Sequence, residues 1–188
     1  MTKLVPTTSN TVGPYLHVGL TWLTTQDIAG TAGGKRIRIT GKIVDADGKV
    51  VPDAIVEIWQ ANPQGKYAHP EDRQDKPLDA AFKGWGRCPT DKDGMFEFTT
   101  LKPGAVPGPG NSLQAPHLAI TIFMRGQLKH LFTRMYFADE AANADDPILG
   151  LVEDKARRDT LIARKDGEGR YRWDVVLQGK NETVFFDC

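Results

Sequence analysis

The stretch KRIRITGKIV, residues 35–44, decides the fold. Isoleucine alternates there with arginine and lysine, which is the two-residue period of a β-strand with one face turned to a core. The turn sequence DADGK comes next, and DAIVEIWQAN at 53–62 predicts a second strand. An Asp-Gly pair favours a tight turn because glycine accepts a positive φ. The regular structure of the chain therefore begins as β-sheet.

Short strands separated by turn residues continue to the end of the chain. Two of them, HLAITIFM at 117–124 and LFTRMYF at 131–137, predict a hairpin across RGQLKH. One short helix is predicted in 152–164, and residues 1–34 are mostly irregular apart from the apolar run YLHVGLTWL. The remaining strands are predicted at 94–101, 171–179 and 182–187. About seven strands with turn signals between them indicate an all-β fold, an antiparallel β-sandwich with long loops.

Composition is that of an ordinary soluble protein with one domain, residues 1–188. The 24 basic and 24 acidic residues cancel, so no overall charge attracts nucleic acid or an anionic membrane. No apolar run approaches the ~20 residues of a membrane span, and the first residues lack the apolar core of a secretory signal. Cys88 and Cys188 are too few for a disulfide framework, which favours the cytoplasm.

Residue chemistry alone predicts no catalytic centre in this chain. The acidic turns at 45–48 and 91–94 lack the further oxygen ligands of a calcium loop, so they are interpreted as hairpin turns. The four histidines never pair at metal-ligand spacing, and the sequence has no Gly-x-Ser-x-Gly nucleophile motif. Cys88 is expected to be a buried, inert thiol. One long stretch without periodicity, residues 60–95, is typical of a functional or interface loop.

The sequence QAPHLAITIFMR, residues 114–125, raises the question of a metal site. Side chains two apart on a strand point to the same face, so a metal-binding strand needs a second donor two residues from His117. That position is Ala119, which has no donor atom. The pattern alone leaves the role of His117 open.

The stretch GKIVDADGKVVPDAIVEIWQANPQGKY, residues 41–67, resembles the signature of the intradiol ring-cleaving dioxygenases. These are non-haem ferric enzymes that open catechols between the two hydroxyl carbons. The likeness continues through GWGRCPTDKDGMFEFTTLKPG, APHLAITIF and TRMYF and ends at ETVFFD. It covers nearly the whole chain, with several long motifs in order. The resemblance implies a β-sandwich of the intradiol type.

Members of this family hold iron with two tyrosines and two histidines. By resemblance these positions are Tyr67, Val106, His117 and Ala119, so two of the four ligands are missing. Fe(III) is a hard cation that prefers anionic oxygen donors, and valine and alanine offer none. His117 is therefore interpreted as the remnant of an iron site, with no metal bound by this chain. The resemblance also places Gln114 where an iron-bearing chain carries an arginine.

The opening TVGPYLHVGL and the closing GKNETVFFD resemble the alpha chains of family members that are built from two homologous chains. This implies a beta chain that binds the Fe(III), a higher-order alpha–beta oligomer, and cleavage of protocatechuate with O2 to 3-carboxy-cis,cis-muconate at a shared pocket. Residues 1–34 would form an N-terminal arm that contacts the partner chain. By resemblance, this chain contributes Thr11, Gly13, Pro14, Tyr15 and Arg125 to the substrate pocket.

The resemblance assigns a role to one arginine, Arg125, and leaves the role of another, Arg134, open. The guanidinium of Arg125 would help to hold an anionic catecholate and its carboxylate, although without the resemblance a surface charge at a hairpin turn is the simpler interpretation. Arg134 lies where iron-bearing chains carry a glutamine, and its role is left open.

Two other interpretations remain. A self-sufficient intradiol dioxygenase would need replacement donors, such as His69 or Asp72 of the long loop. The second is a non-catalytic β-sandwich carrier or adhesion module, although secreted modules of that kind usually carry a signal peptide or disulfides. A neighbouring gene for a homologue with both tyrosines and both histidines would argue against the two of them.

Overall fold

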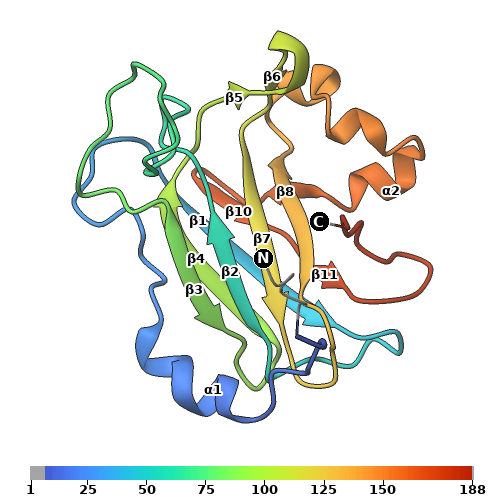
Figure 1. The fold of residues 1–188 in the computed structure, drawn as a ribbon. Coiled ribbons are helices and arrows are strands. Elements are labelled where there is room, and N and C mark those ends of the chain that lie inside the picture. The colour runs from blue at the N-terminus through green and yellow to red at the C-terminus, as the bar shows by residue number, and fades with distance from the viewer. Residues whose placement is uncertain (1–6, 188) are drawn as a thin grey trace, which may run out of the picture.

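The computed structural model describes residues 7–187, so the first six residues of the predicted arm and Cys188 lie outside the described residues. Strands dominate and helices are few, which confirms the all-β class (Figure 1). The strands are β1 (Arg36–Val44), β2 (Ile55–Trp59), β3 (Trp85–Pro89), β4 (Met95–Leu101), β5 (Val106–Pro107), β6 (Leu113–Gln114), β7 (His117–Phe123), β8 (Leu131–Phe137), β9 (Ile162–Lys165), β10 (Arg170–Arg172) and β11 (Val175–Val176).

Two short α-helices, α1 (Tyr15–Leu20) and α2 (Lys155–Asp159), accompany the sheet, where the sequence predicted one. Short 3-10 helices lie at Thr21–Leu23, Pro109–Asn111, Ala141–Asp145 and Leu149–Leu151. Within residues 7–187, no helix has the length and apolar character needed to cross a membrane.

Most strands belong to one mixed sheet that curls into a nearly closed barrel. The order is β3-β2-β7-β8-β9-β10-β1-β4, and β11 pairs with the end of β1. β1 runs parallel to β10 and β11, and β8 parallel to β9, whereas the other pairs are antiparallel. The predicted antiparallel β-sandwich is therefore matched only in part, because the C-terminal strands run alongside β1. β5 and β6 form a separate antiparallel ribbon.

The strands with clear alternation are found close to their predicted bounds. In β1 the isoleucines are buried and the flanking basic residues are exposed or partly exposed. β7 and β8 form the predicted antiparallel hairpin, with His117 opposite Tyr136. The two Asp-Gly turns have one construction: Asp45 and Asp91 each accept hydrogen bonds of 2.9 Å from the backbone N–H groups two and four residues later.

The helix predicted in 152–164 is shorter than expected. Asp154 begins it as an N-cap, accepting hydrogen bonds from two backbone N–H groups, and it ends at Asp159. Residues 162–165 form β9 instead, because they pair with both β8 and β10. Tertiary pairing overrides the local helical pattern there.

Three other segments differ from the prediction. Residues 182–187 form no strand and contribute a single bridge between Phe132 and Phe186. β3 lies inside the stretch predicted as a long loop, because Gly86 and Cys88 turn toward the core and glycine gives no apolar signal. The run YLHVGLTWL forms α1 and the 3-10 turn after it.

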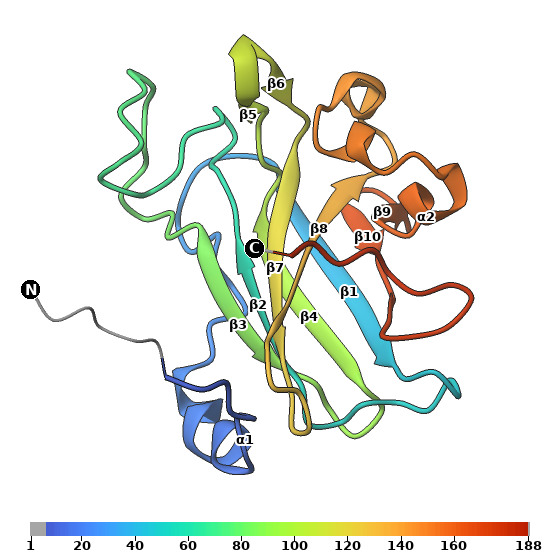
Figure 2. The same ribbon diagram turned by 45° about the vertical axis from the view of Figure 1, so that its right-hand side comes forward.

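The N-terminal arm closes the gap between the two edges of the sheet, where β3 and β4 lie side by side (Figure 2). Thr25 exchanges two backbone hydrogen bonds of 3.0 Å with Arg87 of β3, and the N–H of Ile28 donates to the carbonyl of Thr99 in β4 at 3.0 Å. The Ile28 side chain is 1% exposed and joins the main core. A Cβ at Gly86 would lie 2.6 Å from Cγ2 of Ile28 and 2.7 Å from the Thr25 carbonyl oxygen, so the closure requires glycine there.

We expect Gly86→Ala to lower the free energy of unfolding by about 2 kcal/mol, since overpacking of this kind costs roughly 1–3 kcal/mol. Gly33→Ala is the matched control, because a Cβ at Gly33 meets nothing within 4 Å. Urea unfolding of both variants measures the difference. A Gly86→Ala protein as stable as Gly33→Ala would contradict the close packing of the arm against β3.

Candidate functional site

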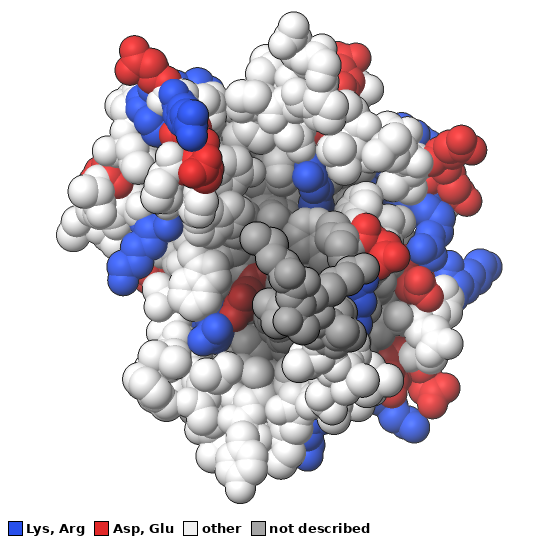
Figure 3. Space-filling model, in the orientation of Figure 1, with Lys and Arg blue, Asp and Glu red and all other residues white. Residues whose placement is uncertain are grey.

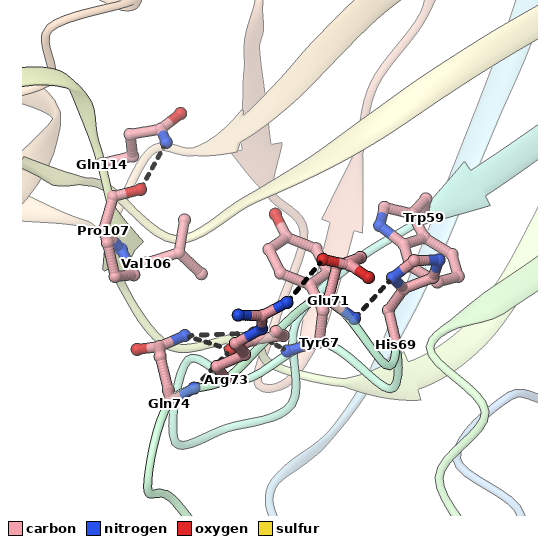
Figure 4. Close-up of a pocket in the computed structure, with 10 residues that line it drawn as sticks. Trp59, Tyr67, His69, Glu71, Arg73, Gln74, Val106, Pro107 and Gln114 are labelled. Carbon is pink, nitrogen blue, oxygen red and sulfur yellow. Dashed lines mark hydrogen bonds and ion pairs between the residues drawn. The ribbon is translucent and has the colours of Figure 1, made fainter.

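A hollow on the outer face of the sheet contains the positions that the sequence singled out. His117 and Ala119 lie on β7, and Ala119 stands between Trp59 of β2 and Arg134 of β8. A cavity of about 890 Å³ opens beside them, with Tyr67, Val106 and Gln114 in its lining. In Figure 4, Trp59 and His69 line one side and Val106, Pro107 and Gln114 the other, with Tyr67 between them. Figure 3 shows this face hollowed between the loop that follows β2 and the β5–β6 ribbon.

The loop after β2 carries Tyr67 to the cavity and fixes it there. The ring of Tyr67 stacks on Trp59, with ring centroids 5.8 Å apart and planes 5° apart. The backbone N–H of Tyr67 donates to Oδ2 of Asp72 at 2.7 Å. Burial raises the pKa of Tyr67, with the charge of Arg134 opposing, so the phenol is protonated at neutral pH.

His69 and Asp72, the replacement donors of a self-sufficient enzyme, have local partners. His69 packs edge-on against Trp59 at 6.2 Å between ring centroids, and its Nδ1 accepts a hydrogen bond of 3.2 Å from the N–H of Glu71. Both carboxylate oxygens of Asp72 accept hydrogen bonds from the loop itself. These side chains shape the loop.

His117 is buried, with 5% of its surface exposed. Its Nδ1 lies 2.7 Å from the carbonyl oxygen of Ala115, which makes Nδ1 the protonated, donating nitrogen. The ring packs against Tyr136, 5.6 Å away between centroids. Burial, together with the charge of Arg134, lowers the pKa of His117 to about 4. At neutral pH the imidazole is therefore uncharged.

Asp146 stands behind His117 and was not found by sequence reasoning. Its buried carboxylate accepts hydrogen bonds from the N–H of Ala115 at 2.6 Å and from the hydroxyl of Tyr136 at 3.1 Å. It also accepts from the N–H groups of Ile148 and Leu149. The Asp-Pro pair at 146–147 signals a turn of this kind, but nothing in the sequence connects that turn to β7.

Arg134 brings a positive charge near the uncharged Tyr67 and His117, with the buried carboxylate of Asp146 bonded to the neighbouring Tyr136. Its Nη1 donates to Oε1 of Gln114 at 2.6 Å, and the guanidinium is partly buried. Within residues 7–187, no carboxylate lies at ion-pair distance from it. Its charge adds to the effect of burial in lowering the pKa of His117, and opposes the effect of burial, which raises the pKa of Tyr67.

The predicted substrate-pocket residues lie elsewhere, at the opposite end of β7. Arg125 follows that strand and is paired with Asp53. The next residue, Gly126, donates its N–H to Oγ1 of Thr11 at 2.8 Å, so the arm touches the β7–β8 turn. About 26 Å separates Arg125 from His117 along the strand, at ~3.3 Å per residue.

The remaining arm residues form the start of α1. Gly13 has φ +61, a conformation that suits glycine, and Pro14 leads into the helix, its carbonyl accepting from the N–H of Val18 at 3.3 Å. Tyr15 is 82% exposed, so it does not anchor the turn in the core of this chain. The structure thus joins Thr11 to the Arg125 turn and leaves Tyr15 in solvent.

Comparison with known proteins agrees with this architecture. Residues 20–179 match the family model described as Dioxygenase. The protocatechuate 3,4-dioxygenase alpha chain of Pseudomonas putida is 41% identical over 206 residues, covering 98% of each chain. That of Burkholderia cepacia is 42% identical over 204 residues, covering 100% of each. The solved structure of catechol 1,2-dioxygenase from Pseudomonas arvilla C-1 superposes with a TM-score of 0.61 at 23% identity, covering 83% of this chain and 56% of that one.

The chain therefore belongs to the intradiol ring-cleaving dioxygenase family. Within the family it is similar over its full length to the alpha chains of protocatechuate 3,4-dioxygenase. It is also similar to the beta chain of the Burkholderia cepacia enzyme, at 41% identity over 160 residues, which cover 80% of this chain and 67% of that one.

Intradiol dioxygenases are iron-dependent, but the residues at the corresponding positions of this chain do not fit Fe(III). Val106 and Ala119 carry no donor atom, so only Tyr67 and His117 of the four positions could bind a metal. Burial raises the pKa of Tyr67, which opposes formation of the phenolate that a hard cation prefers. The guanidinium of Arg134 adds a repelling charge.

We expect the triple variant Val106→Tyr, Ala119→His and Arg134→Gln to bind ferric iron and to develop a tyrosinate-to-iron absorption band. The double variant that keeps Arg134 should bind at least about tenfold more weakly, because the guanidinium repels the metal. Metal titrations followed by visible absorption compare the two, with urea unfolding as the check on folding. If the folded double and triple variants bind ferric iron with equal affinity, the charge of Arg134 does not determine iron binding.

Stability should fall as pH falls below neutral because of His117. An unfolded histidine has a pKa of 6.5 and this one about 4 in the folded chain, so the unfolded state takes up the proton first. The contribution of the neutral His117 to the free energy of unfolding is fully present above pH 6.5. It decreases as the pH falls toward 4, by about 3 kcal/mol at most. Urea unfolding across this range should show a flatter pH dependence for His117→Gln than for the wild type. His130→Gln, at an exposed histidine, is the control and should keep the wild-type slope.

Proposed function

We propose that this chain is the alpha subunit of a protocatechuate 3,4-dioxygenase and that a homologous beta chain binds the Fe(III). One observation carries the proposal: a chain similar to alpha chains over its full length has Val106 and Ala119 where the family needs metal donors. The bound iron supplies the ring-opening chemistry with O2. This chain contributes walls and charge to the pocket and completes an alpha–beta pair, which assembles further in the cytoplasm.

The surface of the arm supports a partner chain. Tyr15, Val18 and Trp22 are 82%, 72% and 76% exposed, although they lie within eight residues of one another. Figure 2 shows α1 standing away from the barrel, so the arm is tied to its own chain mainly through Thr25–Ile28. An apolar patch of this kind on a folded chain marks a protein interface. Residues 1–34 of the single domain are the segment that we assign to this contact.

The arm and Arg125 are assigned to the substrate pocket of the beta chain. Thr11, which bonds the backbone beside Arg125, holds the arm against the same turn that carries this guanidinium. The side chain of Arg125 is 58% exposed even though it pairs with Asp53, so its donors remain accessible to a ligand on a neighbouring chain. Protocatechuate carries a carboxylate, which a guanidinium binds with charge-assisted hydrogen bonds.

The test is to co-express this chain with a beta chain that has both tyrosines and both histidines. We expect a coloured complex that consumes O2 with protocatechuate, with iron remaining on the beta chain after the chains are separated. An isolated alpha chain that binds stoichiometric ferric iron, or a beta chain that forms no complex with it, would overturn the proposal.

In that complex, Arg125→Ala should raise KM for protocatechuate about tenfold with a smaller change in kcat, because a contact to bound substrate is lost. Arg125→Lys should recover part of the loss, since it keeps the charge. Arg164→Ala removes an exposed arginine of β9 and serves as the control. Steady-state O2 uptake at varied protocatechuate gives both constants, and wild-type kinetics in Arg125→Ala would remove this residue from the pocket.

A further inference from the structure

The cavity on the outer face has the features of a binding site in its own right. Its volume of about 890 Å³ lies within the range of small-molecule sites. The stacked rings of Trp59 and Tyr67 face the apolar side chains of Val106 and Pro107 across it (Figure 4). Flat aromatic walls opposite aliphatic ones favour a planar ring between them.

The unmet hydrogen-bonding capacity of Arg134 indicates the charge of the ligand. A guanidinium has five N–H donors in a planar fork. Within residues 7–187, that of Arg134 donates to Gln114, which lines the cavity, adjoins the hydroxyl of Tyr136 and makes no ion pair, so most of its donors are left for a ligand. A partly buried charge without a counter-ion is costly, and a carboxylate is the partner that matches the fork.

The other charged groups near the cavity have partners of their own, which leaves Arg134 as the determinant. The buried carboxylate of Asp146 accepts from the hydroxyl of Tyr136 and from three backbone N–H groups. Glu71 and Arg73 pair with each other at 3.5 Å on the rim, with 75% and 84% of their side chains exposed. Asp72 directs its carboxylate to backbone N–H groups of its own loop. His117 is uncharged at neutral pH, so it neither attracts nor repels an anion there.

We propose that this cavity binds a one-ring aromatic carboxylate without any metal, the ring against Trp59 and Tyr67 and the carboxylate on Arg134. The site belongs to this chain alone and lies at the end of β7 away from Arg125, so it does not depend on the partner proposed above. The positive charge beside these positions selects an anion, where the family's iron would bind a catecholate.

Titration of the full-length chain with 4-hydroxybenzoate, followed by calorimetry and by quenching of tryptophan fluorescence, tests the inference. We expect saturable binding, with quenching that is lost in Trp59→Phe because Trp59 lines the cavity. Phenol, which has the same ring without the carboxylate, should bind at least about tenfold more weakly, a loss of roughly 1.4 kcal/mol.

Variants of Arg134 separate charge from packing. Arg134→Gln should weaken 4-hydroxybenzoate binding about tenfold or more and leave phenol unchanged, while Arg134→Lys recovers part of the affinity. Arg164→Gln should bind as the wild type does. Folding of each variant is checked by urea unfolding. A folded wild-type chain that shows no binding at millimolar ligand, or an Arg134→Gln variant with wild-type affinity, would overturn the inference whatever the outcome with the beta chain.

Discussion

The pairing of Thr25–Ile28 with β3 and β4 is the interaction on which the rest of the structure depends. An open sheet would leave two edges whose N–H and C=O groups attract other strands. The arm bonds to Arg87 on one edge and to Thr99 on the other, and inserts Ile28 into the core. Because the segment is held on both sides, the residues before it leave the barrel from a fixed point. Closure of the sheet thereby determines where the exposed apolar face of α1 is presented.

A second constraint acts beside the cavity, where a guanidinium lies near the positions that hold a ferric ion in the family. The family holds a ferric ion among phenolates and imidazoles, whereas this chain places the guanidinium of Arg134 beside a neutral Tyr67 and a neutral His117. A buried imidazole without its metal keeps a hydrogen bond to the backbone, so the strand geometry around His117 survives the loss of the ligand set. The cavity is present although its lining does not fit ferric iron.

The sequence predicted the strands whose apolar and polar residues alternate cleanly, because that alternation is a local signal. It also predicted the four ligand positions, because the long motifs of the family can be recognised locally. It missed β3, where Gly86 faces the core without an apolar side chain, and β9, where tertiary pairing interrupts the helical pattern. The role of Asp146 was invisible, since its partners Ala115 and Tyr136 are distant along the chain or on another strand. Likewise, only the fold shows that the Arg125 turn and the His117 position stand at opposite ends of one strand.

The position of β1 in the sheet sets the order in which its strand pairs can form. β1 is made early, yet one of its sides pairs with β10 and β11, which begin at Arg170 and Val175. During translation that side stays without partners until residues 170–176 are made, while β4 can already pair with the other side. Long-range parallel pairing of this kind closes slowly. The nascent chain therefore leaves one edge of an isoleucine-rich strand without its partners until residues 170–176 have been made, and an exposed strand edge is prone to pair with other chains.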